Sequence, residues 1–206
     1  MSSTAERILS VATKLFAERG YDGTSVRAIC GAAGANVNAI KYHFGGKKAL
    51  YAAVFQGLGD DRLASAQRIL GTPAQTLAEL ETRLLLFAEE TLATWLAEPE
   101  LLMILFAELQ QGFRNCGPEA TQGLTEQRQV LIGFLKSAQE AGLLRSAVNV
   151  SLVAGTLFER LNNQVIYTNT ISAFHGASIK DPEYRRYWTR HTIDLLLHGA
   201  AAAPPT

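Results

Sequence analysis

The amino-acid sequence predicts an all-α protein of about nine helices. Apolar residues recur at helical spacings of three and four residues along nearly all of the 206 residues. Glycine and proline clusters interrupt this pattern at the expected helix ends, and no segment alternates as a strand would. Hydrophobic residues make up 48% of the chain and charged residues 18%, a balance that indicates a folded protein rather than a disordered one.

The first segment predicts a helix over residues 3–20. Ser3 and Glu6 have the S-x-x-E spacing of a capping box, in which two side chains satisfy free backbone N–H groups at a helix start. One apolar face follows, made of Ile8, Val11, Ala12, Leu15 and Phe16. Gly20 is expected to end this helix.

Two short helices with a tight connection are predicted next. The first begins at Thr24 or Ser25 and ends at Gly34, while Asn36 caps the second, which ends at Gly45-Gly46. The inward residues are expected to be Val26, Ile29, Cys30 and Ala33 in the first helix, and Val37, Ile40 and Phe44 in the second. A helix, a tight turn and a second helix form a unit that can place the second helix in the DNA major groove.

The outward face of that second helix carries groups that could contact DNA. They are Asn38, Ala39, Lys41, Tyr42 and His43. From periodicity alone, a short polar helix is more often a solvated surface. The charge distribution favours a polyanionic partner at the N-terminus, because residues 1–50 hold seven Lys/Arg and three acids, whereas residues 51–206 hold twelve and sixteen.

Longer helical patterns fill the rest of the chain. They lie at about 47–70, 74–97, 99–111, 118–142, 149–174 and 182–199. The Ala- and Pro-rich tail, residues 201–206, is expected to be disordered.

Three motifs carry a resemblance to a known family. They are A-x-x-L-F-x-x-x-G-Y-x-x-T-S-V from Ala12, the turn at Ala33-Gly34, and Y-H-F-x-x-K-x-x-L from Tyr42. Together they make residues 5–55 resemble the DNA-binding domain of the TetR/AcrR family of bacterial transcriptional regulators. The resemblance implies a helix-turn-helix domain at residues 1–48 and a helical ligand-binding and dimerisation domain at residues 49–200.

The resemblance also implies which residues contact DNA. These are Thr24, Ser25, Arg27, Asn36, Asn38, Ala39, Lys41, Tyr42, His43 and Lys47. Tyr42, Lys47 and His43 match a phosphate clamp, although His43 could instead be a packed ring. Asn38, Ala39 and Arg27 are placed to read bases, although Arg27 could instead contact a phosphate or solvent. Thr24 and Ser25 could bind phosphate or act only as helix caps. Lys41 stands where many members carry an aromatic residue.

The second domain is expected to bind a small apolar or amphipathic effector. Candidate ligand residues are Phe87, Glu90, Trp95, Phe106, Phe113, Phe158 and Asn162, although each could instead be ordinary core. The last two long helices are the expected interface of a homodimer. Its candidate residues are Val153, Leu157, Leu161, Val165, Trp188, Ile193 and Leu196, for which the alternative is burial within one subunit.

The sequence thus predicts a ligand-responsive repressor that binds a palindromic double-stranded operator as a dimer. The main alternative is a helix-turn-helix regulator without a small-molecule ligand. A helical-bundle enzyme is disfavoured, because no catalytic motif, metal-ligand spacing or cofactor-binding motif is found. Two cysteines and no long apolar run predict a soluble cytoplasmic protein that does not enter a membrane.

Overall fold

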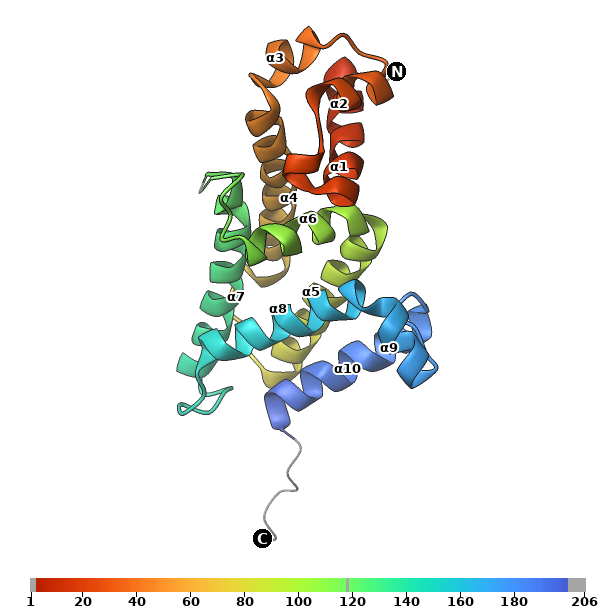
Figure 1. Ribbon diagram of the computed structural model, residues 1–206. Coiled ribbons are helices and arrows are strands. Elements are labelled where there is room, and N and C mark those ends of the chain that lie inside the picture. Colours follow the sequence, from red (N-terminus) through yellow and green to blue (C-terminus); the bar gives the residue numbers. More distant parts are fainter. Residues whose placement is uncertain (1–2, 118, 200–206) are drawn as a thin grey trace, which may run out of the picture. The chain divides into compact units, whose positions relative to one another are not determined.

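The computed structural model describes residues 3–117 and 119–199, and every regular element within them is helical (Figure 1). Ten α-helices and one short 3-10 helix occur in these ranges. The all-α prediction is therefore confirmed. The sequence predicted about nine helices, and ten α-helices are observed in the described ranges. The predicted tail, residues 201–206, lies outside the described residues.

The chain folds into two compact units. The first comprises Met1–Leu63 with Glu98–Glu126, and the second comprises Ala64–Ala97 with Gln127–Thr206. A later helix thus joins the N-terminal helices in the first unit. The sequence predicted a boundary between a DNA-binding domain that ends at residue 48 and a ligand-binding domain that begins at residue 49. That boundary divides the chain by function and not by packing, and it stays a prediction.

The first unit is built around α1. Its elements are α1 (Thr4–Gly23), α2 (Val26–Ala33), α3 (Asn38–Phe44), the first part of α4 (Lys47–Leu70), α6 (Pro99–Gln110), η1 (Glu119–Thr121) and the start of α7 (Gln122–Glu140). Helix α1 contacts α2, α3 and α6. Its capping box forms as predicted, with both the Ser3 and Glu6 side chains bonded to backbone N–H groups. Gly20 bends the helix at φ 68° instead of ending it, and helical residues continue to Gly23.

Helices α2 and α3 form the predicted helix-turn-helix. Ser25 caps α2, and Gly34 ends it in the left-handed conformation at φ 61°. Ile40 anchors α3 in the core with 1% of its surface exposed. Val37 was predicted to face inward, but it precedes α3 and is 48% exposed, because the helix begins one residue later, at Asn38.

A close approach of α4 and α7 requires glycine on both helices. A Cβ atom added to Gly123 would lie 2.5 Å from the carbonyl carbon of Gly59, closer than real Cβ contacts come. The absence of side chains at both positions lets the two backbones touch within the first unit.

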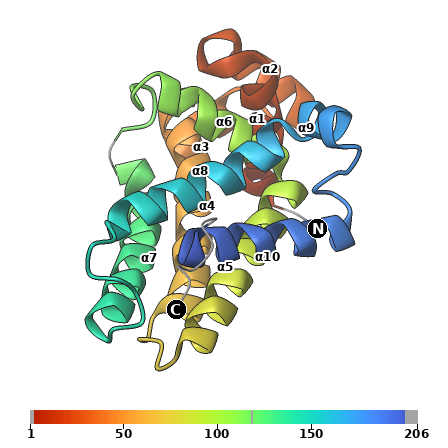
Figure 2. The same cartoon turned by 90° about the horizontal axis from the view of Figure 1, so that it is seen from below.

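The second unit packs α5 against two long helices. Its elements are α5 (Leu77–Ala97), α8 (Val150–Ile166), α9 (Thr168–His175), α10 (Pro182–His198) and the remaining parts of α4 and α7. Helices α8 and α10 both contact α5 and each other, as Figure 2 shows from below. Helix α5 begins later than predicted, because the Thr76 hydroxyl caps it by accepting from the Glu79 N–H at 3.2 Å.

One predicted helix, over residues 149–174, is two helices in the structure. The break lies at Tyr167, between α8 and α9. No glycine or proline occurs near Tyr167, and the apolar periodicity continues through this position. The sequence therefore predicted a single helix here. No helix in the described part of the chain is long and apolar enough to cross a membrane.

Candidate nucleic-acid interface

Helix α3 presents polar side chains to solvent on the side opposite Ile40. Asn38, Lys41 and His43 are exposed, and Tyr42 is 85% exposed. Asn36 was predicted to cap this helix, but Val37 is the N-cap residue; the Asn36 side chain accepts from the Asn38 N–H at 2.9 Å just before the helix. The face therefore combines an amide, a cation, a phenol and an imidazole, which are groups that can contact bases and phosphates.

Helix α2 adds two predicted contact residues. Arg27 is exposed in the first turn of the helix, where its guanidinium can move toward a base or a phosphate. The Ser25 hydroxyl accepts from the Ala28 N–H at 3.1 Å, so its capping role is formed. Ser25 is also exposed, which leaves a second role at a phosphate open to it.

Thr24 corrects the phosphate-binding prediction. Its side chain is 1% exposed, and its hydroxyl donates to the backbone oxygens of Leu15 at 3.0 Å and Gly20 at 2.8 Å. A hydroxyl that is buried and already donating is not available to a phosphate. Thr24 instead ties the start of α2 to the bend in α1.

Replacing Thr24 with valine should lower the free energy of unfolding by about 1–3 kcal/mol, because it removes a buried hydroxyl with hydrogen bonds. Urea unfolding followed by circular dichroism measures this change. The Thr24→Ser control keeps the hydroxyl and should lose only about 0.8 kcal/mol for the missing methyl group. Equal stability of wild type and Thr24→Val would show that these hydrogen bonds do not hold the bend.

Lys47 lies at the first turn of α4 and is half-buried against an aromatic ring. Its Nζ atom lies 4.2 Å from the centroid of the Tyr21 ring, a cation–π contact. Tyr21 could not be predicted as a partner of Lys47, because 26 positions separate the two residues and only folding brings them together. The contact orients the ammonium group of Lys47, which the sequence motif predicts to bind a phosphate.

The His43 ring lies 4.9 Å from the Tyr42 ring and stays exposed.

The predicted ligand residues are divided between the two units. Phe106 and Phe113 belong to the first unit, and the other five belong to the second. Phe87 and Trp95 are buried in the second unit, where the Phe87 and Phe158 rings meet edge to face at 5.8 Å. Glu90 forms an ion pair with Arg68 and accepts from Ser65. The seven residues therefore do not form one site within a single unit.

Asn162, one of the predicted ligand residues, has a buried polar atom that could bind a ligand. Its Oδ1 atom is buried in the second unit and has no hydrogen-bond partner among the described residues. A buried amide oxygen without a partner is unfavourable in a finished core.

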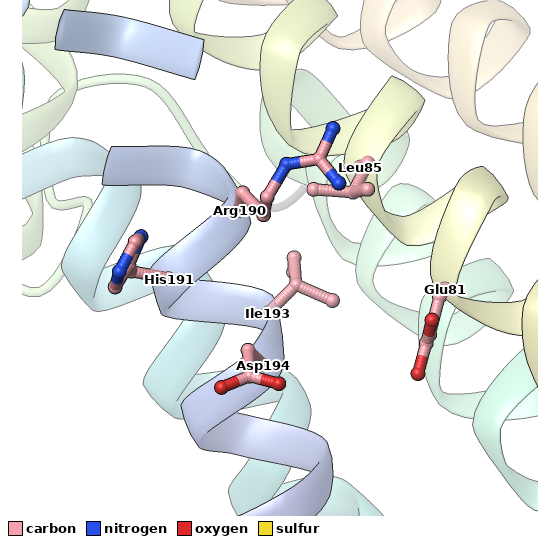
Figure 3. A pocket seen from close by; sticks show the side chains of 6 residues that line it. All are labelled: Glu81, Leu85, Arg190, His191, Ile193 and Asp194. Atoms are coloured by element: carbon pink, nitrogen blue, oxygen red, sulfur yellow. The ribbon is translucent and has the colours of Figure 1, made fainter. Parts of the chain in front are cut away.

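Two surface cavities lie in the second unit. One, of about 310 Å³, is lined by Glu81 and Leu85 of α5 and by Arg190, His191, Ile193 and Asp194 of α10 (Figure 3). The other, of about 320 Å³, is lined by Leu77, Leu143, Leu144, Arg145, Val148, Val153, Leu196, Leu197 and His198. The charged groups of the first cavity were not among the predicted site residues, because they lie on two helices, α5 and α10, that only folding brings together.

The predicted dimer residues are mostly interior. Leu157, Leu161, Val165, Trp188 and Ile193 are all buried within the single chain, with Leu161 at 0% exposure. Val153 and Leu196 are half-buried in the second cavity. The prediction selected the apolar face of each helix, and that face packs inside the unit. The apolar residues that α8 and α10 leave exposed are Leu152, Tyr187 and Leu195.

Comparison with known proteins supports the assignment of the N-terminal helices. A family model described as bacterial regulatory proteins of the tetR family matches residues 8–54. The transcriptional repressor NicS of Pseudomonas putida is 25% identical over 205 residues, covering 95% of this chain and 92% of its own.

Solved structures share the fold. PfmR, a TetR family regulator from Thermus thermophilus, superposes with a TM-score of 0.76 at 23% identity, over 98% of this chain and 100% of its own. The regulator FadR from Bacillus subtilis, solved with stearoyl-CoA, superposes with a TM-score of 0.69 at 18% identity, over 95% and 99%. The motifs of residues 5–55, the observed helix-turn-helix and the family match over residues 8–54 agree, so the N-terminal DNA-binding helices are of the type found in the TetR family of bacterial regulatory proteins.

Proposed function

We propose that this protein is a homodimeric transcriptional repressor whose α3 helices enter successive major grooves of a palindromic operator, and whose second unit binds a small effector that releases DNA. The observation that carries the proposal is the polar face of α3. Asn38, Lys41 and Tyr42 project into solvent while Ile40 fixes the opposite side in the core.

The charge around this helix is suited to DNA. Residues 23–59 contain four basic side chains, Arg27, Lys41, Lys47 and Lys48, and no aspartate or glutamate. A continuous stretch without acidic groups attracts phosphates and repels none of them. Base contacts from Asn38, Ala39 and Arg27 would then supply sequence preference, because phosphate contacts carry none.

An apolar or amphipathic effector is proposed for the second unit. Its interior is rich in aromatic and aliphatic side chains, and the partnerless Oδ1 atom of Asn162 offers a directing polar group. FadR, which has the same fold, was solved with an amphipathic acyl-CoA. An effector that binds better to a dimer shape unable to span both half-sites would release DNA, given a coupling of roughly 1–3 kcal/mol or more.

Replacing Asn162 with leucine should raise the free energy of unfolding of the ligand-free protein by about 1 kcal/mol, because it removes a buried amide oxygen that has no partner among the described residues. Thermal or urea unfolding measures the difference. Asn163 is exposed on the same helix, so Asn163→Leu is a matched control that should leave stability within about 0.5 kcal/mol of wild type. A destabilised Asn162→Leu protein would indicate that the amide has a structural partner and is not kept for a ligand.

The proposed function is tested by footprinting the purified protein on fragments of its source genome. A protected palindrome with half-sites one helical turn apart, about 34–36 Å, is expected. Protection should disappear for Asn38→Ala at competitor DNA concentrations that the wild type withstands. Uniform, sequence-independent protection would contradict the proposal.

A further inference from the structure

A small cavity in the first unit lies among α1, α4 and α6. It has a volume of about 250 Å³, and its lining includes four aromatic residues, Phe16, Tyr21, Tyr51 and Phe106, together with Glu108. Phe16, Tyr51 and Glu108 are each no more than 2% exposed and form the floor. Exposed residues, among them Met103 at 47%, form the rim, so the cavity has a buried base and an accessible mouth.

Glu108 is a buried acid whose hydrogen-bonding capacity is already used. Its Oε1 accepts from the Tyr51 hydroxyl at 3.0 Å and from the Asn115 side-chain amide at 2.8 Å. Its Oε2 accepts from the Asn115 backbone N–H at 3.4 Å, and the Cys116 thiol lies at 3.9 Å. All of these groups donate, as they would to a carboxylate.

The Glu108 carboxylate forms no direct ion pair within the described part of the chain, although Lys48 is close enough to oppose the rise in the pKa of the neighbouring Cys116. Among the described residues, no lysine, arginine or histidine lies within ion-pair distance of Glu108. Burial and then the nearby Glu108 charge raise the pKa of Cys116 to about 11, and burial followed by the Glu108 hydrogen bond raises the pKa of Tyr51. Both neighbours therefore remain neutral donors near neutral pH, and the carboxylate keeps them as hydrogen-bond partners.

The aromatic walls supply the other half of a cation site. The Tyr51 ring meets the Phe16 ring at 4.7 Å and the Tyr21 ring at 4.9 Å, both edge to face. Tyr21 already accepts the Lys47 ammonium group 4.2 Å from its ring centroid, so the electrostatics of this cluster favour a positive charge.

We propose that this cavity binds a small quaternary ammonium cation. Aromatic rings and one anionic group attract a positive charge, and among the described residues the Glu108 carboxylate forms no direct ion pair. A primary ammonium would need acceptors for its N–H groups, and the Glu108 oxygens are already occupied by donors. A methylated ammonium has no N–H to satisfy and needs only charge and aromatic contact.

The size of the cavity limits the ligand. At about 250 Å³ it is below the range of about 300–1,000 Å³ that drug-sized ligands occupy. A trimethylammonium head group with a short polar arm matches this space, and the exposed side chains of Gln110 and Gln111 at the rim could bond such an arm. The site belongs to the first unit and does not depend on the DNA-binding proposal.

Isothermal titration calorimetry with choline and with 3,3-dimethyl-1-butanol tests the proposal. The two compounds have nearly the same shape, and only choline is charged. Choline should bind at least about tenfold more tightly than the neutral alcohol. Equal binding of the two would assign the cavity to apolar ligands, and failure of choline to bind would leave Glu108 a structural residue; either result overturns the proposal.

Two substitutions locate the site. Glu108→Gln removes the charge and keeps the size, and it should weaken choline binding about tenfold or more while leaving the neutral alcohol unaffected. If that variant is unfolded, the rim provides a second test that spares the core. Met103→Lys should weaken choline binding by charge repulsion, whereas Met103→Gln should not; equal affinities of these two rim variants for choline would place any binding elsewhere.

Discussion

Leu195→Asp should convert the protein into a folded monomer that has lost most of its affinity for its operator. Leu195 is 44% exposed on α10, the helix that also exposes Tyr187 at 59%. A carboxylate in an apolar interface between two copies would be buried without a partner. Because two linked half-sites bind much more tightly than one, operator affinity should fall by about 10²–10⁴-fold.

Sedimentation equilibrium and operator titration measure these effects. Leu86→Asp is the matched control, because Leu86 is 55% exposed on α5 and the same charge is introduced on a different helix. The control should remain dimeric. Leu161→Asp should instead unfold the second unit, since Leu161 is completely buried in the single chain. A Leu195→Asp protein that stays dimeric would exclude this face of α10 from the interface.

Asn38→Ala and Lys47→Ala should impair DNA binding in two different ways. Asn38→Ala should cost roughly 1–3 kcal/mol on the operator alone, because an amide that bonds a base edge discriminates between bases. Lys47→Ala should weaken binding to every duplex nearly equally. It should also reduce the slope of log affinity against log salt by about one per lost phosphate contact, and therefore by about two per dimer.

Competition titrations with operator and scrambled duplexes at several salt concentrations separate the two effects. Lys14→Ala serves as a control for simple loss of charge, because Lys14 lies on α1 and was not assigned to DNA. Lys14→Ala should leave the specificity ratio unchanged. It should change the slope of log affinity against log salt by no more than a fraction of a unit. If Asn38→Ala leaves the specificity ratio intact, base reading belongs to Arg27 or Lys41 and the orientation of α3 in the groove is different.

Local signals predicted the N-terminal helices well. The Ser3–Glu6 capping box and the left-handed Gly34 depend on atoms a few residues apart, so the sequence contains everything needed to form them. The same holds for the start of α6 at Pro99. The break between α8 and α9 was missed, because nothing near Tyr167 prevents a helix from continuing.

The candidate sites were less predictable, because burial is a property of the whole fold. Thr24 has the same local pattern whether its hydroxyl faces DNA or the backbone oxygens of α1, and only packing decided that it points inward. Apolar faces of α8 and α10 looked equally suited to a partner subunit or to the interior. Packing against α5 assigned Leu157 and Leu161 to the interior.

The sequence by itself determined the helix-turn-helix, its polar outer face and the resemblance of the N-terminal helices to the TetR family, since these follow from short-range periodicity, capping residues and motif order. The tertiary structure decided which side chains meet across helices. It placed Lys47 on Tyr21, left Asn162 Oδ1 without a partner among the described residues and surrounded Glu108 with hydrogen-bond donors. The physical reason is that capping and periodicity act within a few residues, whereas burial and charge compensation depend on groups that only folding brings together.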